Sequence, residues 1–200
     1  MMKNSRRAFL VGATAVLSSP AWARRIRTKA DQLIASARGQ VGVTLTYDPA
    51  YSRLSFPNGD VSRAKGVCTD VIVRAYRDAF GLDLQALLNA DMKLAFSAYP
   101  KRWGLSTTDR NIDHRRVPNL QTFLARQGAK LPIPADASGW QPGDIVTSLV
   151  GGTLPHIGIV SDRRTISGRP LVIHNIGRGT REEDVLLDHK FTGRYRWKLG

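Results

Sequence analysis

Cys68 is the only cysteine among the 200 residues, and its neighbours predict that it stands at the start of a helix. An amphipathic run from Val71 to Phe80 follows it, and Gly81 ends that run. A cysteine is nucleophilic as a thiolate, and the N–H groups and dipole of a helix N-terminus favour that negative charge. The position therefore predicts a lowered pKa for the thiol. The alternative is a buried cysteine that packs as a small apolar side chain.

Two histidines follow in strand-like segments. His156 begins the run His-Ile-Gly-Ile-Val, and His174 precedes Asn175 at the end of Leu-Val-Ile-His-Asn. A cysteine, a histidine and a third polar residue in this order are typical of thiol hydrolases, in which the histidine takes the thiol proton. Successive strand residues point to opposite faces, so only one of His174 and Asn175 is expected to orient His156.

The first 23 residues have the pattern of an export signal. Arg6 and Arg7 precede a short apolar stretch, and Ala21-Trp22-Ala23 resembles a cleavage site. The arginine pair also matches the twin-arginine signal, which exports folded proteins. We therefore expect a mature chain, residues 24–200, in the periplasm or outside the cell, with no stable membrane insertion.

The amino-acid composition of the chain indicates which kinds of binding partner to expect. The formal charge of +14 favours anionic partners, and export makes a cell-wall or other envelope polymer a better expectation than nucleic acid. His114 and His189 show no metal-ligand spacing with Cys68, so no metal is expected, and no cofactor motif is apparent. We expect a monomer.

Hydrophobic periodicity predicts one α+β domain, with helices first and an antiparallel sheet of about five strands second. A helical insertion is expected around residues 83–130. The expected helices lie near residues 30–37, 68–80, 83–96 and 118–127, and the expected strands at 145–150, 156–161, 170–176, 185–187 and 194–198.

These motifs carry a resemblance to known proteins. Cys68, Pro142-Gly143-Asp144, Pro155-His156-Ile157-Gly158 and Ile173-His174 resemble the NlpC-type cell-wall cysteine peptidases of the papain-like superfamily. Over most of the mature chain, including the segments 111–120 and 173–177, the sequence is similar to a YijF-like bacterial family of unknown function, domain of unknown function 1287. The resemblance implies a papain-like fold, with the cysteine-bearing helix packed on the sheet, and favours His174 as the third catalytic residue, with Asn175 the alternative.

The resemblance also implies residues that bind substrate. Tyr47 stands where NlpC-type enzymes often place an active-site tyrosine, although a packed aromatic is an alternative. Asp70, two residues after Cys68, is among the flanking residues that differ from those of the NlpC-type enzymes, and we expect it to bind substrate. Arg115 and Arg116 lie in the insertion, where they would meet an acidic substrate or remain solvated on a helical buttress.

The expected function is cleavage of an amide bond in the cell wall, in peptidoglycan stem peptides, through an acyl-cysteine intermediate. Two alternatives stay open. One is a catalytically inactive basic module that binds an envelope polymer, and the other is a thiol acyltransferase or esterase acting on a different substrate.

Overall fold

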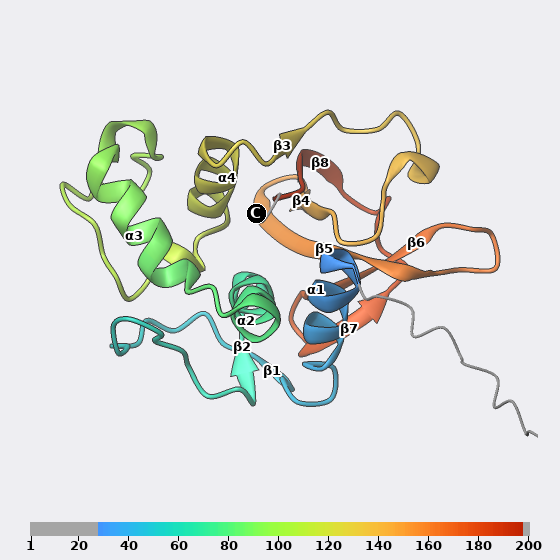
Figure 1. Ribbon diagram of the computed structural model, residues 1–200, viewed down its shortest axis with the longest axis horizontal. Coiled ribbons are helices and arrows are strands. Elements are labelled where there is room, and N and C mark those ends of the chain that lie inside the picture. Colours follow the sequence, from blue (N-terminus) through green and yellow to red (C-terminus); the bar gives the residue numbers. More distant parts are fainter. Residues whose placement is uncertain (1–27, 198–200) are drawn as a thin grey trace, which may run out of the picture.

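The computed structural model describes residues 28–197, so the expected signal peptide lies outside the described residues. The architecture is α+β, with helices first and a sheet second, as the periodicity predicted. The helices are α1 (Lys29–Arg38), α2 (Cys68–Phe80), α3 (Leu84–Leu94) and α4 (Val117–Arg126), with short 3₁₀ turns η1 (Phe96–Ala98), η2 (Asp113–Arg115) and η3 (Ala137–Gly139). Figure 1 shows α3 and α4 on one side of the molecule and β6 (Pro170–Asn175) on the other, with α1 and α2 between them, and α1 contacts β5 (Leu154–Arg164) and β6.

The main sheet is antiparallel throughout and has six strands in the order β3-β8-β4-β5-β6-β7, rather than about five. A separate pair, β1 and β2, runs parallel ahead of α2. The strands are β1 (Thr46–Tyr47), β2 (Lys65–Gly66), β3 (Lys130–Leu131), β4 (Ile145–Val150), β5 (Leu154–Arg164), β6 (Pro170–Asn175), β7 (Thr180–Glu183) and β8 (Lys190–Tyr195).

Two of the expected strands are misplaced. The strand expected at 185–187 lies earlier, at Thr180–Glu183, and the strand expected at 194–198 spans Lys190–Tyr195. Val185 and Leu186 pack instead from a loop against the buried Trp140. This packing buries Leu186 and partly buries Val185 without pairing either of them to another strand.

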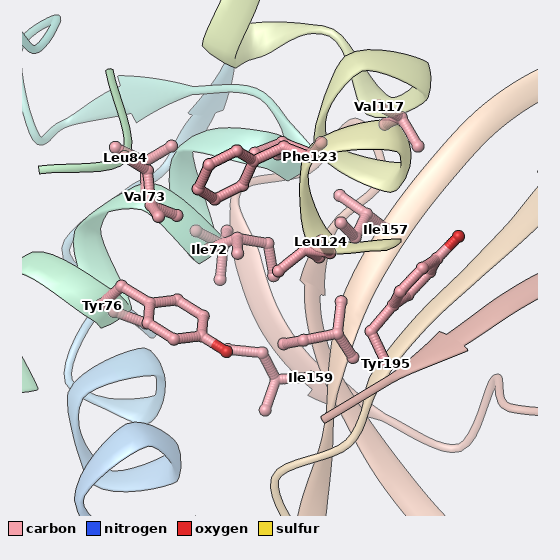
Figure 2. Close-up of a cluster of buried hydrophobic side chains, with 14 of the residues drawn as sticks. Ile72, Val73, Tyr76, Leu84, Val117, Phe123, Leu124, Ile157, Ile159 and Tyr195 are labelled. Carbon is pink, nitrogen blue, oxygen red and sulfur yellow. The ribbon is translucent and has the colours of Figure 1, made fainter. Parts of the chain in front are cut away.

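The core lies between α2 and one face of the sheet. Ile157 and Ile159 of β5 and Ile173 of β6 belong to the same buried cluster as Ile72 and Tyr76 of α2. Figure 2 shows Ile72 and Ile157 within this cluster, beside Phe123 and Leu124 of α4. Because α3 and α4 contribute to this core, the segment 83–130 is packed into the domain rather than attached to its surface.

The opposite face of the sheet carries a second, smaller cluster. It consists of Trp140, Val146, Val160, Val172 and Leu186. Side chains alternate between the two faces along a strand, so the even-numbered residues of β5, including His156, start on the face away from α2. None of the helices between residues 28 and 197 is long and apolar enough to cross a membrane.

Candidate active site

Helix α2 begins at Cys68 because its first turn is closed by a buried carboxylate. Val67 is extended, and Asp70 Oδ2 accepts its backbone N–H at 2.7 Å. Arg115 holds Asp70 through bonds of 3.0 Å from Nε and from Nη2, with both side chains buried. Arg115 also donates to the carbonyls of Asp48 and Ala50. Asp70 and Arg115 therefore fix the position of the helix start and of the thiol on it.

The thiol is buried, and this changes its expected chemistry. Burial raises the pKa of Cys68 to about 12, against the lowering effect of the backbone N–H groups of Ile157, Thr69 and Cys68 itself. The lowered pKa expected from the helix start is therefore wrong for the resting protein, because desolvation of the thiolate outweighs these N–H groups. The proton stays on sulfur until a base removes it.

The sulfur lies at an open edge of β5. The N–H of Val160 donates to the Asp144 carbonyl on the β4 side. Strand N–H groups alternate between the two edges, so the N–H of Ile157 points to the other side, toward β6. The pairing of β5 with β6 includes Ile159 but does not reach Ile157, whose N–H faces the Cys68 sulfur instead. The thiol thus lies beside the backbone of the residue that follows His156.

His156 and His174 are in direct contact. His156 Nε2 and His174 Nδ1 are 2.8 Å apart, and the rings are inclined at 73°. His174 Nε2 in turn lies 3.3 Å from Glu183 Oε2 on β7. Asn175 has a different partner, because its Nδ2 donates to the Gly66 carbonyl at 3.0 Å and ties β6 to the segment before Cys68. Of the two candidates for the third residue, His174 is the one that contacts His156.

Protonation is disfavoured on both rings. Burial lowers the pKa of His156 to about 3, with the neighbouring His174 and His189 adding to the effect. Burial also lowers the pKa of His174, although Glu183 opposes it. At neutral pH the two imidazoles and the Cys68 thiol are therefore all uncharged.

The chain of bonds assigns the protons on the two rings. A carboxylate oxygen accepts the hydrogen bond at His174 Nε2, which assigns the proton of His174 to Nε2 and makes its Nδ1 the acceptor. His156 Nε2 then donates to that Nδ1, which leaves His156 Nδ1 with a free lone pair. We name this arrangement of His156, His174 and Glu183 the histidine chain. Its free nitrogen is the one a general base needs.

The histidine chain and the thiol line separate cavities and are linked through the backbone, since Ile157 follows His156 and its N–H faces the sulfur. Across residues 28–197, no hydrogen bond joins the Cys68 sulfur to His156. The ring of His156 lies on the face of the sheet away from α2, whereas Cys68 belongs to the core cluster between α2 and the sheet.

Cys68 lines a cleft of about 270 Å³ together with Tyr47, Arg115 and Arg116. Tyr47 is 36% exposed, and burial followed by the nearby Cys68 and Asp70 raises its pKa to about 12. Four of the residues expected from sequence, Cys68, Tyr47, Arg115 and Arg116, thus line this cleft. Asp70 does not line it. Pro155, which precedes His156, lines the cleft as well.

Three residues of the site were missed by sequence reasoning. Glu183 was missed because its strand was placed five residues too late. Arg102 and Trp103 line the cleft from a segment without clear periodicity, so nothing local indicated their position. Among the described residues, 28–197, no group of three or more His, Cys, Asp or Glu side chains is arranged to hold a metal ion.

Comparison with known proteins places this site within a family. The chain is 50% identical over 161 residues to the uncharacterized protein YijF of Escherichia coli (strain K12), covering 80% of this chain and 78% of that protein. Residues 34–197 match the domain of unknown function DUF1287, a stretch that holds Cys68 and the whole histidine chain. The chain belongs to the DUF1287 family.

Proposed function

We propose that this protein is a thiol hydrolase that cleaves an amide bond with Cys68 as nucleophile. Two observations support the proposal: the N–H of Ile157, the residue after His156, faces the Cys68 sulfur, and His156 belongs to the hydrogen-bonded histidine chain. In the same proposal the α+β domain is a papain-like, NlpC-type fold, which the resemblance of its motifs supports.

The first step begins from neutral groups. His156 Nδ1 takes the thiol proton while sulfur attacks the carbonyl carbon, so the S–C bond forms as the carbonyl electron pair moves to oxygen. The first N–H groups of α2 lack partners within the helix, and that of Cys68 is placed to stabilise the oxyanion. The high pKa of the thiol and the low pKa of His156 require this transfer during attack.

The later steps use His156 first as an acid and then again as a base. The imidazolium of His156 gives its proton to the leaving amine as the C–N bond breaks, which leaves an acyl-cysteine. Water then attacks the thioester as His156 takes one of its protons, the S–C bond breaks to release the carboxylic acid, and His156 returns the proton to sulfur. Glu183 stabilises the transient positive charge through His174, because its carboxylate is at the far end of the hydrogen-bonded chain.

The proposed substrate is a peptidoglycan stem peptide at the cell envelope. The resemblance to NlpC-type cell-wall peptidases, the export pattern at the N-terminus and the basic composition support this choice.

The direct test compares the mature wild-type protein with Cys68→Ala on purified peptidoglycan, with mass spectrometry of the released fragments. We expect cleaved stem peptides from the wild type and none from the variant. Arg53→Gln is a control for handling, because Arg53 is exposed and does not line the cleft. Equal release from wild type and Cys68→Ala, or an inert but folded wild type, contradicts the proposal.

One observation favours a second candidate, an inactive envelope-binding module. The thiol is buried, has a raised pKa and is not bonded to His156. Alkylation with iodoacetamide between pH 7 and 10 separates the two functions. A catalytic thiol reacts faster in the wild type than in His156→Ala at pH 7, whereas an inert thiol reacts slowly in both and only gains rate with alkali.

A further inference from the structure

The cleft beside Cys68 has charge of one sign. Its charged lining residues are Arg102, Arg115 and Arg116, and no Asp or Glu is among the residues that line it. All three arginines come from the segment 83–130, which also supplies Trp103 to the same cleft. The side of the cleft made by Arg102, Trp103 and Arg116 is called here the arginine wall.

The three arginines differ in what already neutralises them. Arg115 is buried and committed to Asp70 and to two backbone carbonyls. Arg116 forms one bond, from Nη1 to Asp113 at 3.0 Å, and its guanidinium lies 4.1 Å from the centre of the Trp103 ring. Arg102 is exposed and has no carboxylate partner among residues 28–197. The cleft therefore keeps an uncompensated positive charge at Arg102.

Trp103 organises the wall. The Arg102 guanidinium carbon lies 5.7 Å from the centre of its ring, so both arginines of the wall are within cation–π range of one indole. An arginine held near a flat surface loses less freedom on binding and can pair with a carboxylate through two parallel N–H···O bonds.

We propose that the arginine wall is a carboxylate-binding subsite, and that the substrate held at Cys68 is a peptide with a free carboxylate. This inference rests on the proposed function for the role of Cys68, while the binding that it predicts does not require catalysis. Arg102 supplies the main contact and Arg116 supports it through its remaining N–H groups. The cleft volume of about 270 Å³ suits a short peptide segment rather than a folded partner.

The test measures binding by isothermal titration calorimetry with the mature Cys68→Ala protein, in which no turnover occurs. The probes are a peptidoglycan stem tetrapeptide with its carboxyl groups free and the same peptide with these groups amidated. We expect amidation to weaken binding about tenfold, as for the loss of one charge-assisted hydrogen-bonded pair. Arg102→Gln on the same background is expected to abolish this preference, and Arg53→Gln to retain it.

The outcomes separate the subsite from the proposed function. Equal affinity for the two peptides, no measurable binding of either, or a preference that survives Arg102→Gln overturns the subsite. A preference that depends on Arg102 supports it, even if the wild type cleaves neither peptide and the proposed function fails. Circular dichroism checks that Arg102→Gln is folded, which its exposed position leads us to expect.

Discussion

The histidine chain and the arginine wall are the two regions assigned to the proposed reaction, and they are built in opposite ways. His156 and His174 are 8% and 1% exposed, sit on neighbouring strands and are connected by hydrogen bonds to Glu183. Arg102 is exposed, comes from an irregular segment and has no carboxylate partner in the described part of the chain. A proton-transfer system needs fixed distances and a dry environment, whereas a group that selects substrates must remain free to meet them. We therefore propose that the sheet supplies the proton transfer and that the segment 83–130 selects the substrate.

Replacing the base is expected to have the largest effect on rate. His156→Ala should lower kcat/KM for stem-peptide cleavage about a thousandfold, within the range for loss of general acid–base catalysis. Arg102→Gln should lower it only about tenfold, mainly through KM, because it removes binding and leaves the chemistry intact. Steady-state kinetics on one peptide checks both variants. If Arg102→Gln is as damaging as His156→Ala and acts on kcat, the division between the two regions is wrong.

Removing the ion pair between Asp70 and Arg115, which holds the start of α2, is expected to have the largest effect on stability. Asp70→Ala leaves Arg115 buried without its partner, so the free energy of unfolding should fall by about 3–5 kcal/mol. The matched control is Asp78→Ala, which removes the exposed partner of Arg63 and should cost less than about 1 kcal/mol. Urea unfolding of both variants measures the difference. If both variants lost a similar free energy of unfolding, burial would not be what makes the Asp70–Arg115 ion pair important for stability.

The sequence predicted the parts of the site that depend on local pattern. The start of α2 at Cys68 followed from the amphipathic run after it, and the contact between His156 and His174 agrees with the expected order of residues. Glu183 was not predictable in this way, because its contact with His174 depends on how β7 pairs with β6.

The pKa of the Cys68 thiol could not be predicted from sequence either. The helix start correctly indicated N–H groups near Cys68, but the pKa depends on how deeply the rest of the fold buries the sulfur. Likewise, the apolar run at Val185 and Leu186 looked like a strand because burial alone gives the same pattern. Packing between distant segments decided both cases.

Glu183→Gln tests the far end of the histidine chain. A glutamine both donates and accepts, so it no longer requires the proton of His174 to stay on Nε2. We expect kcat to fall about tenfold at unchanged KM, because the correct tautomer and the stabilised imidazolium are partly lost. Glu183 raises the pKa of His174, so the acidic limb of the kcat profile should also move to lower pH.

The matched control is Glu182→Gln, which changes the neighbouring acid on β7. Glu182 pairs with Arg38 instead of a histidine, so this variant should keep the tautomers and the pH profile of kcat. A change in stability without any change in the profile of Glu183→Gln would reduce Glu183 to a structural role.

The smallest expected effect is on the pH dependence of the free energy of unfolding. This prediction compares His114, a buried histidine outside the site, with His156 inside it. Burial lowers the pKa of His114 to about 4 and that of His156 to about 3, whereas both return to about 6.5 in the unfolded chain. Between these values the unfolded state binds more protons, so the free energy of unfolding falls as pH is lowered from about 6.5. Each histidine contributes a slope of at most about 1.4 kcal/mol per pH unit.

Urea unfolding between pH 5 and 7 measures this slope where most carboxylates stay ionised. His114→Gln should reduce the slope by one histidine's share while leaving kcat nearly unchanged, because His114 lies outside the histidine chain and does not line the cleft. His156→Gln should reduce the slope and remove activity together. An unchanged slope in both variants would mean that burial does not keep either ring neutral. The proposed transfer of the thiol proton during attack, which starts from a neutral His156, would then lose its basis.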